Sequence, residues 1–224
     1  MLLAILAGHD VSLSERAIIG AAICIHLEFK ERVAVPLKLH IIACSTRPGR
    51  VGIGVAKWFE GVAVQHAKFA SELVDLATFN LPVYDEPRHP RLQKYEHDHT
   101  KKWSASVAAA DAFVFVTPEY NFGPPPSLLN ALDYVYLEWN YKPAAFVSYG
   151  GMSGGIRAVQ TEKLTMTTLK MVPIIEAVSI PMVAKQLNEA GQFTPNEAQT
   201  DAANAMLNEL LRWAEALKPL RQAK

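Results

Sequence analysis

From Leu37 onward, short apolar runs alternate along the chain with segments of helical periodicity. The apolar runs, which we expect to form strands, cover residues 37–43, 71–76, 112–117 and 143–148 and a stretch within 174–180. The segments expected to form helices lie near residues 51–67, 99–110, 126–138, 154–170 and 195–217. Strands that alternate with helices imply parallel strands joined by crossover helices, which cover both faces of the sheet. The order of elements therefore predicts an α/β fold built on a doubly wound parallel sheet.

Three of the expected strands run directly into polar or glycine-rich loops. Leu37–Ala43 is followed by Cys-Ser-Thr-Arg-Pro-Gly-Arg at 44–50, Ala112–Val116 by Thr-Pro-Glu-Tyr-Asn at 117–121, and Ala144–Val147 by Ser-Tyr-Gly-Gly-Met-Ser-Gly-Gly at 148–155. Open α/β sheets bind ligands in the crevice at the carboxyl ends of their strands. Three such loops predict one composite pocket.

The first loop has the chemistry of a phosphate site. Ser45 offers a hydroxyl, Arg47 and Arg50 offer guanidinium groups, and a helix that begins near Val51 would add unpaired backbone N–H groups. Alternatively, both arginines are solvated surface residues around a Pro-Gly turn. The loop is neither a dinucleotide-binding fingerprint nor a Walker loop, which disfavours a dehydrogenase of the Rossmann type and an ATPase.

The other two loops suit a flat ring. Pro118 restricts the residue before it to an extended conformation, and Tyr120 and Asn121 can present aromatic surface and amides to a heterocycle. Alternatively, Tyr120 and Phe122 cap the core. The glycines of the third loop allow a backbone to approach a ligand closely, although a plain turn would also use them.

Composition narrows the class of partner. With 224 residues, half of them hydrophobic, the chain can bury one substantial core. A net charge of zero argues against nucleic acid or an anionic membrane surface as a partner, and favours a small molecule. The two cysteines, Cys24 and Cys44, can form neither a disulfide framework nor a zinc cluster, as is usual for a cytoplasmic chain.

A metal site is also not expected. His89, His97 and His99 lie among carboxylates, but their spacing matches no standard zinc pattern and loop histidines are usually solvated.

Residues 1–36 precede the first strand of the alternating pattern. Met1–Gly8 is too short to span a bilayer and lacks the flanking features of a signal peptide, so we expect neither an anchor nor a leader there. A helix through Ser14–Phe29 is conceivable. We expect the folded domain to cover residues 37–220 and residues 1–36 to form a peripheral extension with its boundary at Pro36.

Four motifs, taken in their order along the chain, resemble those of a known family. Ser-Thr-Arg-Pro-Gly-Arg at 45–50, Pro-Glu-Tyr-Asn at 118–121, Asn-Ala-Leu-Asp at 130–133 and the glycine-rich segment at 148–155 resemble the NAD(P)H-dependent FMN reductases, which include quinone, azo-dye and chromate reductases. The resemblance covers about residues 37–217. It implies a flavodoxin-like three-layer sandwich with a five-stranded parallel sheet in the order 2-1-3-4-5.

The resemblance also implies where the cofactor lies. Ser45, Arg47 and Arg50 match the loop that holds the FMN phosphate. The residues that match the surroundings of the ribityl chain and the flavin ring are Pro118, Glu119, Tyr120 and Asn121 on one side and Tyr149, Gly150 and Gly151 on the other. No catalytic acid, base or nucleophile is expected among the side chains, because the flavin itself carries the redox chemistry.

The implied activity is that of an NAD(P)H-dependent flavin oxidoreductase. It would use NADPH or NADH to reduce bound FMN and pass electrons to a quinone, free flavin, azo compound or similar small acceptor. Two alternatives stay open: an electron carrier of the flavodoxin type, although such carriers tend to be acidic, and a flavin-binding protein without turnover.

Self-association as a homodimer or homotetramer is implied as well. Tyr134, Tyr136, Trp139 and Tyr141 offer more aromatic surface than the core is expected to need. Alternatively, Tyr134 and Trp139 are buried within the chain.

Overall fold

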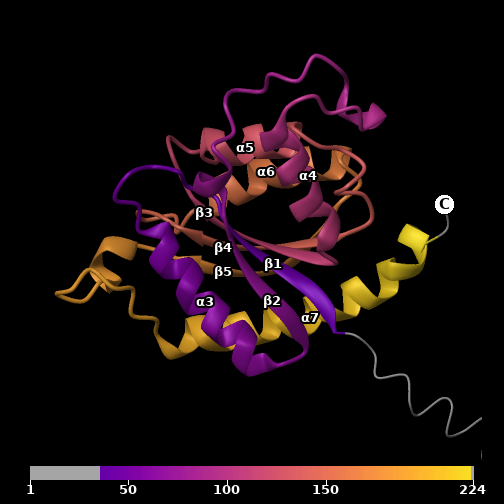
Figure 1. The fold of residues 1–224 in the computed structure, drawn as a ribbon. Helices are drawn as coiled ribbons and strands as arrows, with labels where there is room; N and C mark the ends of the chain where they lie inside the picture. The colour runs from indigo at the N-terminus through magenta and orange to yellow at the C-terminus, as the bar shows by residue number, and fades with distance from the viewer. Residues whose placement is uncertain (1–35, 223–224) are drawn as a thin grey trace, which may run out of the picture. The chain divides into compact units, whose positions relative to one another are not determined.

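The structure, a computed structural model, describes residues 36–222, and its strands form one parallel sheet (Figure 1). The strands are β1 (Leu37–Ala43), β2 (Phe69–Asp75), β3 (Ala112–Pro118), β4 (Pro143–Tyr149) and β5 (Val172–Ile180). Their order is β2-β1-β3-β4-β5, and all neighbouring pairs are parallel, which confirms the predicted topology. The helix considered at 14–29, and the extension apart from Pro36, lie outside the described residues, so the domain boundary stays a prediction.

Helices cover both faces of the sheet (Figure 1). On one face α3 (Gly52–His66) and α7 (Glu197–Gln222) pack against the sheet in one apolar cluster. A second cluster holds α4 (Asp98–Ala109), α5 (Pro126–Asp133) and α6 (Ile156–Thr168) against the other face. Because β3 and β4 lie between the two clusters, every one of their residues is buried. The flavodoxin-like three-layer sandwich is thereby confirmed.

Helix α5 is shorter than the predicted helix at 126–138, since it ends at Asp133. The Glu138 carboxylate accepts a hydrogen bond from the backbone N–H of Tyr136 (3.2 Å), and the Asn140 side chain donates to the Tyr136 carbonyl (2.8 Å). Side chains therefore satisfy backbone groups that a longer helix would have paired. The prediction of helix for residues 134–138 is wrong for this reason.

Helix α7 extends beyond the predicted end at 217 and continues through Pro219. Its last turn is anchored by Arg221, which donates to the carbonyl of Tyr141 (3.0 Å) and pairs with Asp111 (2.8 Å). Tyr141 lies just before β4, and Asp111 lies just before β3. They are distant in sequence, so the helical periodicity alone did not reveal the extra turns.

Two of the four aromatic side chains that follow α5 belong to the core. Tyr134 and Trp139 are fully buried, and Trp139 makes edge contacts with Trp103 and Phe113 at ring separations of 5.8 and 4.9 Å. The interpretation of these two residues as surplus aromatic surface is therefore wrong. Tyr136 and Tyr141 are only partly buried, and self-association stays a prediction.

The long segment between β2 and α4 contains two short 3-10 turns, η1 (Leu76–Phe79) and η2 (Pro90–Leu92), and a third, η3 (Val183–Gln186), follows β5. Asp85 holds the segment between β2 and α4 in place, since it accepts hydrogen bonds from Tyr134 (2.8 Å) and His99 (3.0 Å). His97 stacks on His99. Within residues 36–222 no group of three or more His, Cys, Asp or Glu side chains is arranged to hold a metal ion.

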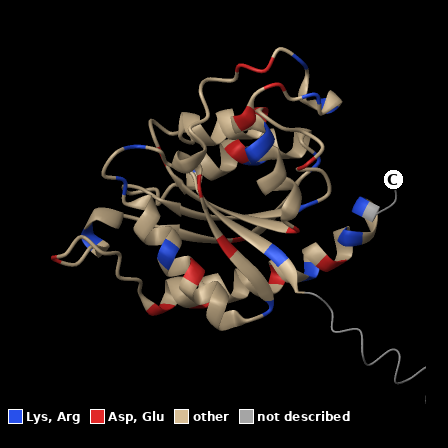
Figure 2. Cartoon of the chain, in the orientation of Figure 1, with Lys and Arg blue, Asp and Glu red and all other residues tan. Residues whose placement is uncertain are grey.

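Charged residues of both signs are interspersed over the helices and loops (Figure 2), in keeping with the net charge of zero. Among the described helices, none combines the length and the apolar character that crossing a membrane requires.

One buried carboxyl group interrupts the apolar face of α6. Glu162 is 1% exposed and lies on the same face as Ala158, Val159 and Met166. Its Oε1 atom has no hydrogen-bond partner in the described part of the chain. Burial raises the pKa of Glu162 to about 7, and the negative charge of Asp133 acts in the same direction.

Replacing Trp139 with alanine is expected to lower the free energy of unfolding by about 3–5 kcal/mol, because a fully buried indole leaves a cavity. Trp213→Ala is the matched control, since Trp213 is 39% exposed on α7 and should cost only about 1 kcal/mol. Urea unfolding measures both. Equal costs would contradict the placement of Trp139 in the core.

Glu162 should make stability depend on pH. The unfolded chain loses the Glu162 proton near the ordinary pKa of 4.5 and the folded chain only near 7, so the free energy of unfolding should fall as pH rises through this window, by up to about 3 kcal/mol. In Glu162→Gln this component should vanish, whereas exposed Glu215→Gln should behave as wild type. Urea titrations at about pH 5 and about pH 8 test this. An unchanged pH dependence in Glu162→Gln would contradict it.

Candidate functional site

The three predicted loops meet at the carboxyl edge of β1, β3 and β4. At the root of the first loop, the backbone N–H of Cys44 donates to the Val116 carbonyl (3.0 Å). Further out, the hydroxyls of Ser45 and Tyr120 share a hydrogen bond of 2.8 Å. The second and third loops are joined where the N–H of Glu119 donates to the Tyr149 carbonyl (3.2 Å). The three loops that the sequence predicted to form one pocket therefore contact one another.

The first loop presents donors at the start of α3. Ser45 is buried, and its hydroxyl oxygen accepts from the backbone N–H of Arg47 at 3.4 Å. The Arg47 side chain is exposed and makes no hydrogen bond or ion pair with the described residues. No side chain caps the N-terminus of α3, so its first N–H groups and the positive end of its dipole face this loop. This combination suits a phosphate group.

Arg50 makes an ion pair that the sequence analysis did not predict. Its guanidinium forms an ion pair with Asp75 at the end of β2, and both side chains are about one-fifth exposed. Asp75 also accepts from the N–H of Ala77 (3.0 Å) at the start of η1. Arg50 thus ties the first loop to the end of the neighbouring strand, while Arg47 keeps its donors free.

Tyr149 points beneath the first loop. Its side chain is 5% exposed, and a Cβ placed on Gly52 would lie 2.2 Å from its hydroxyl oxygen. Only glycine at 52 leaves room for this ring. Burial raises the pKa of the Tyr149 hydroxyl, so the group is neutral at physiological pH. Tyr149 therefore supports the loop from below, whereas its backbone continues into the glycines of the third loop.

The third loop is closely packed where it turns into α6. Gly154 has a φ of +60°, and a Cβ there would lie 2.2 Å from the Ser179 hydroxyl. Its carbonyl accepts hydrogen bonds from Ser148 (2.8 Å) and Ser179 (3.2 Å). Gly150 and Gly151 precede this anchor. A Cβ placed on Gly151 would have no heavy atom within 4 Å, so the surface at this residue is open.

The second loop displays its tip to solvent. Tyr120 and Gly123 exchange two backbone hydrogen bonds of 2.9 Å, and the residues between them have positive φ, 49° at Asn121 and 70° at Phe122. These values are those of a tight hairpin turn of the I′ type. Phe122 is 66% exposed, so it does not cap the core.

Arg157, which the sequence analysis did not single out, clamps the second loop. Its Nε donates to Glu119 Oε1 (2.7 Å) and its backbone N–H to Oε2 (3.1 Å), while its guanidinium lies 3.8 Å from the centroid of the Phe122 ring. Burial alone would raise the pKa of Glu119, but the hydrogen bonds from Arg157 hold it below its ordinary value. A cation in the first turn of a helix is unfavourable, because it lies at the positive end of the helix dipole. The arginine at 157 could therefore have indicated in the sequence that a carboxylate lies near it.

Cys44 is not a reactive thiol. It is fully buried, its Sγ donates to the Ile42 carbonyl (3.3 Å), and burial raises its pKa well above the ordinary value.

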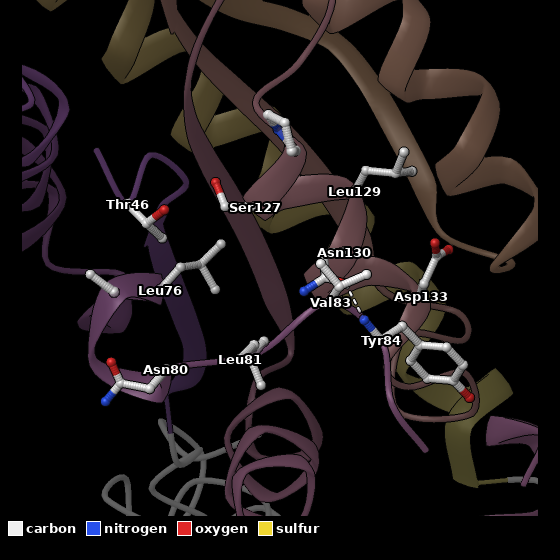
Figure 3. A pocket seen from close by; sticks show the side chains of 12 residues that line it. Thr46, Leu76, Asn80, Leu81, Val83, Tyr84, Ser127, Leu129, Asn130 and Asp133 are labelled. Atoms are coloured by element: carbon white, nitrogen blue, oxygen red, sulfur yellow. Dashed lines mark hydrogen bonds between the residues drawn. The ribbon is translucent and has the colours of Figure 1, made fainter. Parts of the chain in front are cut away.

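A pocket of about 860 Å³ opens beside the first loop, between η1 and α5 (Figure 3). Its lining comes from the first loop, the segment after β2, and α5: Thr46, Leu76, Ala77, Asn80, Leu81, Val83, Tyr84, Pro126, Ser127, Leu129, Asn130 and Asp133. None of the ten predicted site residues belongs to this set. Thr46 stands between the predicted residues Ser45 and Arg47, so the pocket adjoins the site without coinciding with it.

Comparisons with known proteins identify a family and support the fold. The family model described as "NADPH-dependent FMN reductase" matches residues 37–185. An NAD(P)H-dependent FMN reductase of Schizosaccharomyces pombe is 35% identical over 188 residues, which are 81% of this chain and 94% of that protein. A probable NADPH:quinone oxidoreductase of Oryza sativa is 47% identical over 135 residues, 55% of this chain and 61% of that protein.

Among solved structures, the flavoenzyme NAD(P)H:acceptor oxidoreductase FerB of Paracoccus denitrificans has a similar fold. It matches with a TM-score of 0.63 at 20% identity, covering 80% of this chain and 98% of that one. The family match includes all three loops of the site. From the loops, the sheet order and these matches together, the chain belongs to the NADPH-dependent FMN reductase family.

Proposed function

We propose that the chain uses NAD(P)H to reduce FMN held by the three loops, and that it passes the electrons to a small acceptor such as a quinone. As a member of its family the chain is an oxidoreductase that works with FMN and NAD(P)H. The names of its relatives, FMN reductases and NADPH:quinone oxidoreductases, support a quinone as the acceptor. The observation that carries the proposal is the uncapped start of α3, with Arg47 beside it, next to the exposed hairpin at Asn121.

The residues present fit the parts of FMN. The phosphate has Ser45, the free Arg47 side chain and the N-terminus of α3 as donors. Arg50 and Tyr149 are proposed to shape this loop, through Asp75 and through the space left at Gly52. Pro118, Glu119, Tyr120 and Asn121 would lie along one side of the ribityl chain and ring, and the backbone at Gly150 and Gly151 along the other.

When bound, FMN supplies the hydride and electron chemistry, so the side chains have to bind and orient. Arg157 neutralises Glu119 and fixes the second loop against α6. The hydrogen bond between Ser45 and Tyr120 keeps the phosphate loop and the ring loop in register. Held in this way, the loops can present backbone donors to the ring at little cost in conformational entropy.

The proposed enzyme is a cytoplasmic homodimer or homotetramer. Exposed apolar side chains near the site support self-association, since Phe122, Met152 and Ile156 are 66%, 90% and 51% exposed. The buried aromatic residues after α5 do not support self-association.

The purified chain should carry FMN and oxidise NAD(P)H when a quinone is supplied. Mass spectrometry of ligand released by heat should find FMN, and steady-state assays should show multiple turnovers. Bound FMN without turnover would contradict the enzyme and favour a carrier or a binding protein. Stoichiometric FAD would contradict the single-phosphate site.

Arg47→Ala should weaken FMN binding roughly ten- to hundredfold, about 1.5–3 kcal/mol, because a charge-assisted phosphate contact is lost. Riboflavin lacks the phosphate, so its affinity should change little. Arg212→Ala removes a similar charge from the exposed surface of α7 and should bind FMN like wild type. Fluorescence titration of the apoprotein measures these affinities. Equal losses for FMN and riboflavin would assign Arg47 a structural role.

A further inference from the structure

Glu119 places a carboxylate in the second loop, among the residues proposed to lie along the flavin ring. Its side chain is only 6% exposed. Arg157, in the first turn of α6, donates from Nε to Oε1 (2.7 Å) and from its backbone N–H to Oε2 (3.1 Å), and its Nη2 pairs with Oε1. Within residues 36–222 no other cation forms an ion pair with this carboxylate. The charge of Glu119 is therefore offset by Arg157 alone.

Arg157 also holds the tip of the same loop. Its guanidinium lies 3.8 Å from the centroid of the Phe122 ring, a cation–π contact. Asn121 and Phe122 both have positive φ, which residues other than glycine seldom adopt, so the turn depends on contacts from outside the loop. One side chain thus secures the second loop at its base, through Glu119, and at its tip, through Phe122.

The charge of Glu119 matters for the reaction proposed above. When NAD(P)H gives a hydride to FMN, it leaves as NAD(P)⁺, and the flavin gains one negative charge. A carboxylate without a partner in the loop beside the ring would repel that charge and favour the oxidised form. The Arg157 guanidinium, which is 48% exposed, removes this repulsion without a second carboxylate to neutralise it.

We propose that Arg157 is a positioning residue for the flavin reaction: it holds the second loop through Glu119 and Phe122, and it offsets the Glu119 charge so that reduced FMN stays bound. The inference rests on the proposed function. It assigns the two arginines near the site different tasks, since Arg47 is proposed to contact the phosphate and Arg157 acts on the loop proposed for the ring. Their variants should therefore differ in which flavins they affect.

The first test measures binding of oxidised flavins by fluorescence titration of the apoprotein. Arg157→Gln should weaken FMN and riboflavin by the same factor, about three- to tenfold, because the loop loses its support but the phosphate site is intact. Arg212→Gln is the matched control: Arg212 is 78% exposed on α7 and pairs with Glu209 (2.7 Å), away from the loops. It should bind both flavins like wild type. A loss confined to FMN would make Arg157 a phosphate ligand and overturn the inference.

The second test separates charge from support. The reduction potential of the FMN-loaded protein, compared with that of free FMN, gives the ratio of the affinities for reduced and oxidised FMN. In Arg157→Gln this ratio should fall about two- to tenfold, since Glu119 keeps its charge without a partner. A tenfold fall corresponds to about 30 mV for a two-electron couple. A purely structural role would weaken both forms alike and leave the ratio unchanged.

Three further variants check the sign. Arg157→Lys keeps the cation and should hold the ratio within about twofold of wild type. In the double variant Glu119→Gln/Arg157→Gln neither charge is present, so the ratio should return to the wild-type value. Glu119→Gln alone leaves the cation without its carboxylate and should raise the ratio, which keeps the test decisive if Arg157→Gln does not fold.

The inference is overturned if Arg157→Gln and Glu119→Gln both leave the ratio unchanged, if the double variant shows the same fall as Arg157→Gln, or if Arg212→Gln lowers the ratio equally. Its failure is distinguishable from that of the proposed function. A protein that binds FMN and shows these changes of ratio, but does not turn over NAD(P)H with a quinone, overturns only the function. Turnover with unchanged ratios overturns only this inference.

Discussion

β3 pairs with β1 on one side and with β4 on the other, and because all three strands are parallel, their loops leave the sheet at one edge. The registers Ala43↔Val116 and Pro118↔Tyr149 bring the three strand ends level. This pairing depends on the burial of both faces of β3, whose residues are all covered by the two apolar clusters. The geometry of the candidate site therefore depends on the packing of β3 between the two apolar clusters.

A small set of side-chain contacts then holds the neighbouring loops of the candidate site together. The Ser45–Tyr120 hydrogen bond joins the first loop to the second, and the Glu119–Arg157 ion pair joins the second to α6. Arg50 with Asp75 secures the first loop on its other side. Arg47 is left as the free cation of this loop, next to an uncapped helix start. The two arginines differ because, within residues 36–222, only Arg50 forms an ion pair with a carboxylate.

The boundary at Thr46 separates two environments of opposite charge. On the side of Arg47 the donors suit a phosphate, while on the side of α5 the walls are apolar and the only charged group is Asp133.

The sequence by itself determined the elements, their alternation and the edge at which the loops gather. Apolar runs such as Ala112–Val116 and helical periodicity are local signals, and the handedness of crossovers leaves few arrangements for them. The tertiary structure decided what depends on partners far along the chain: the burial of Trp139, the end of α5 at Asp133, the pairing of Arg50 with Asp75 and the clamp formed by Arg157. Local pattern cannot specify these contacts, because each depends on which side chain of another segment the folded sheet brings within hydrogen-bond or van der Waals distance.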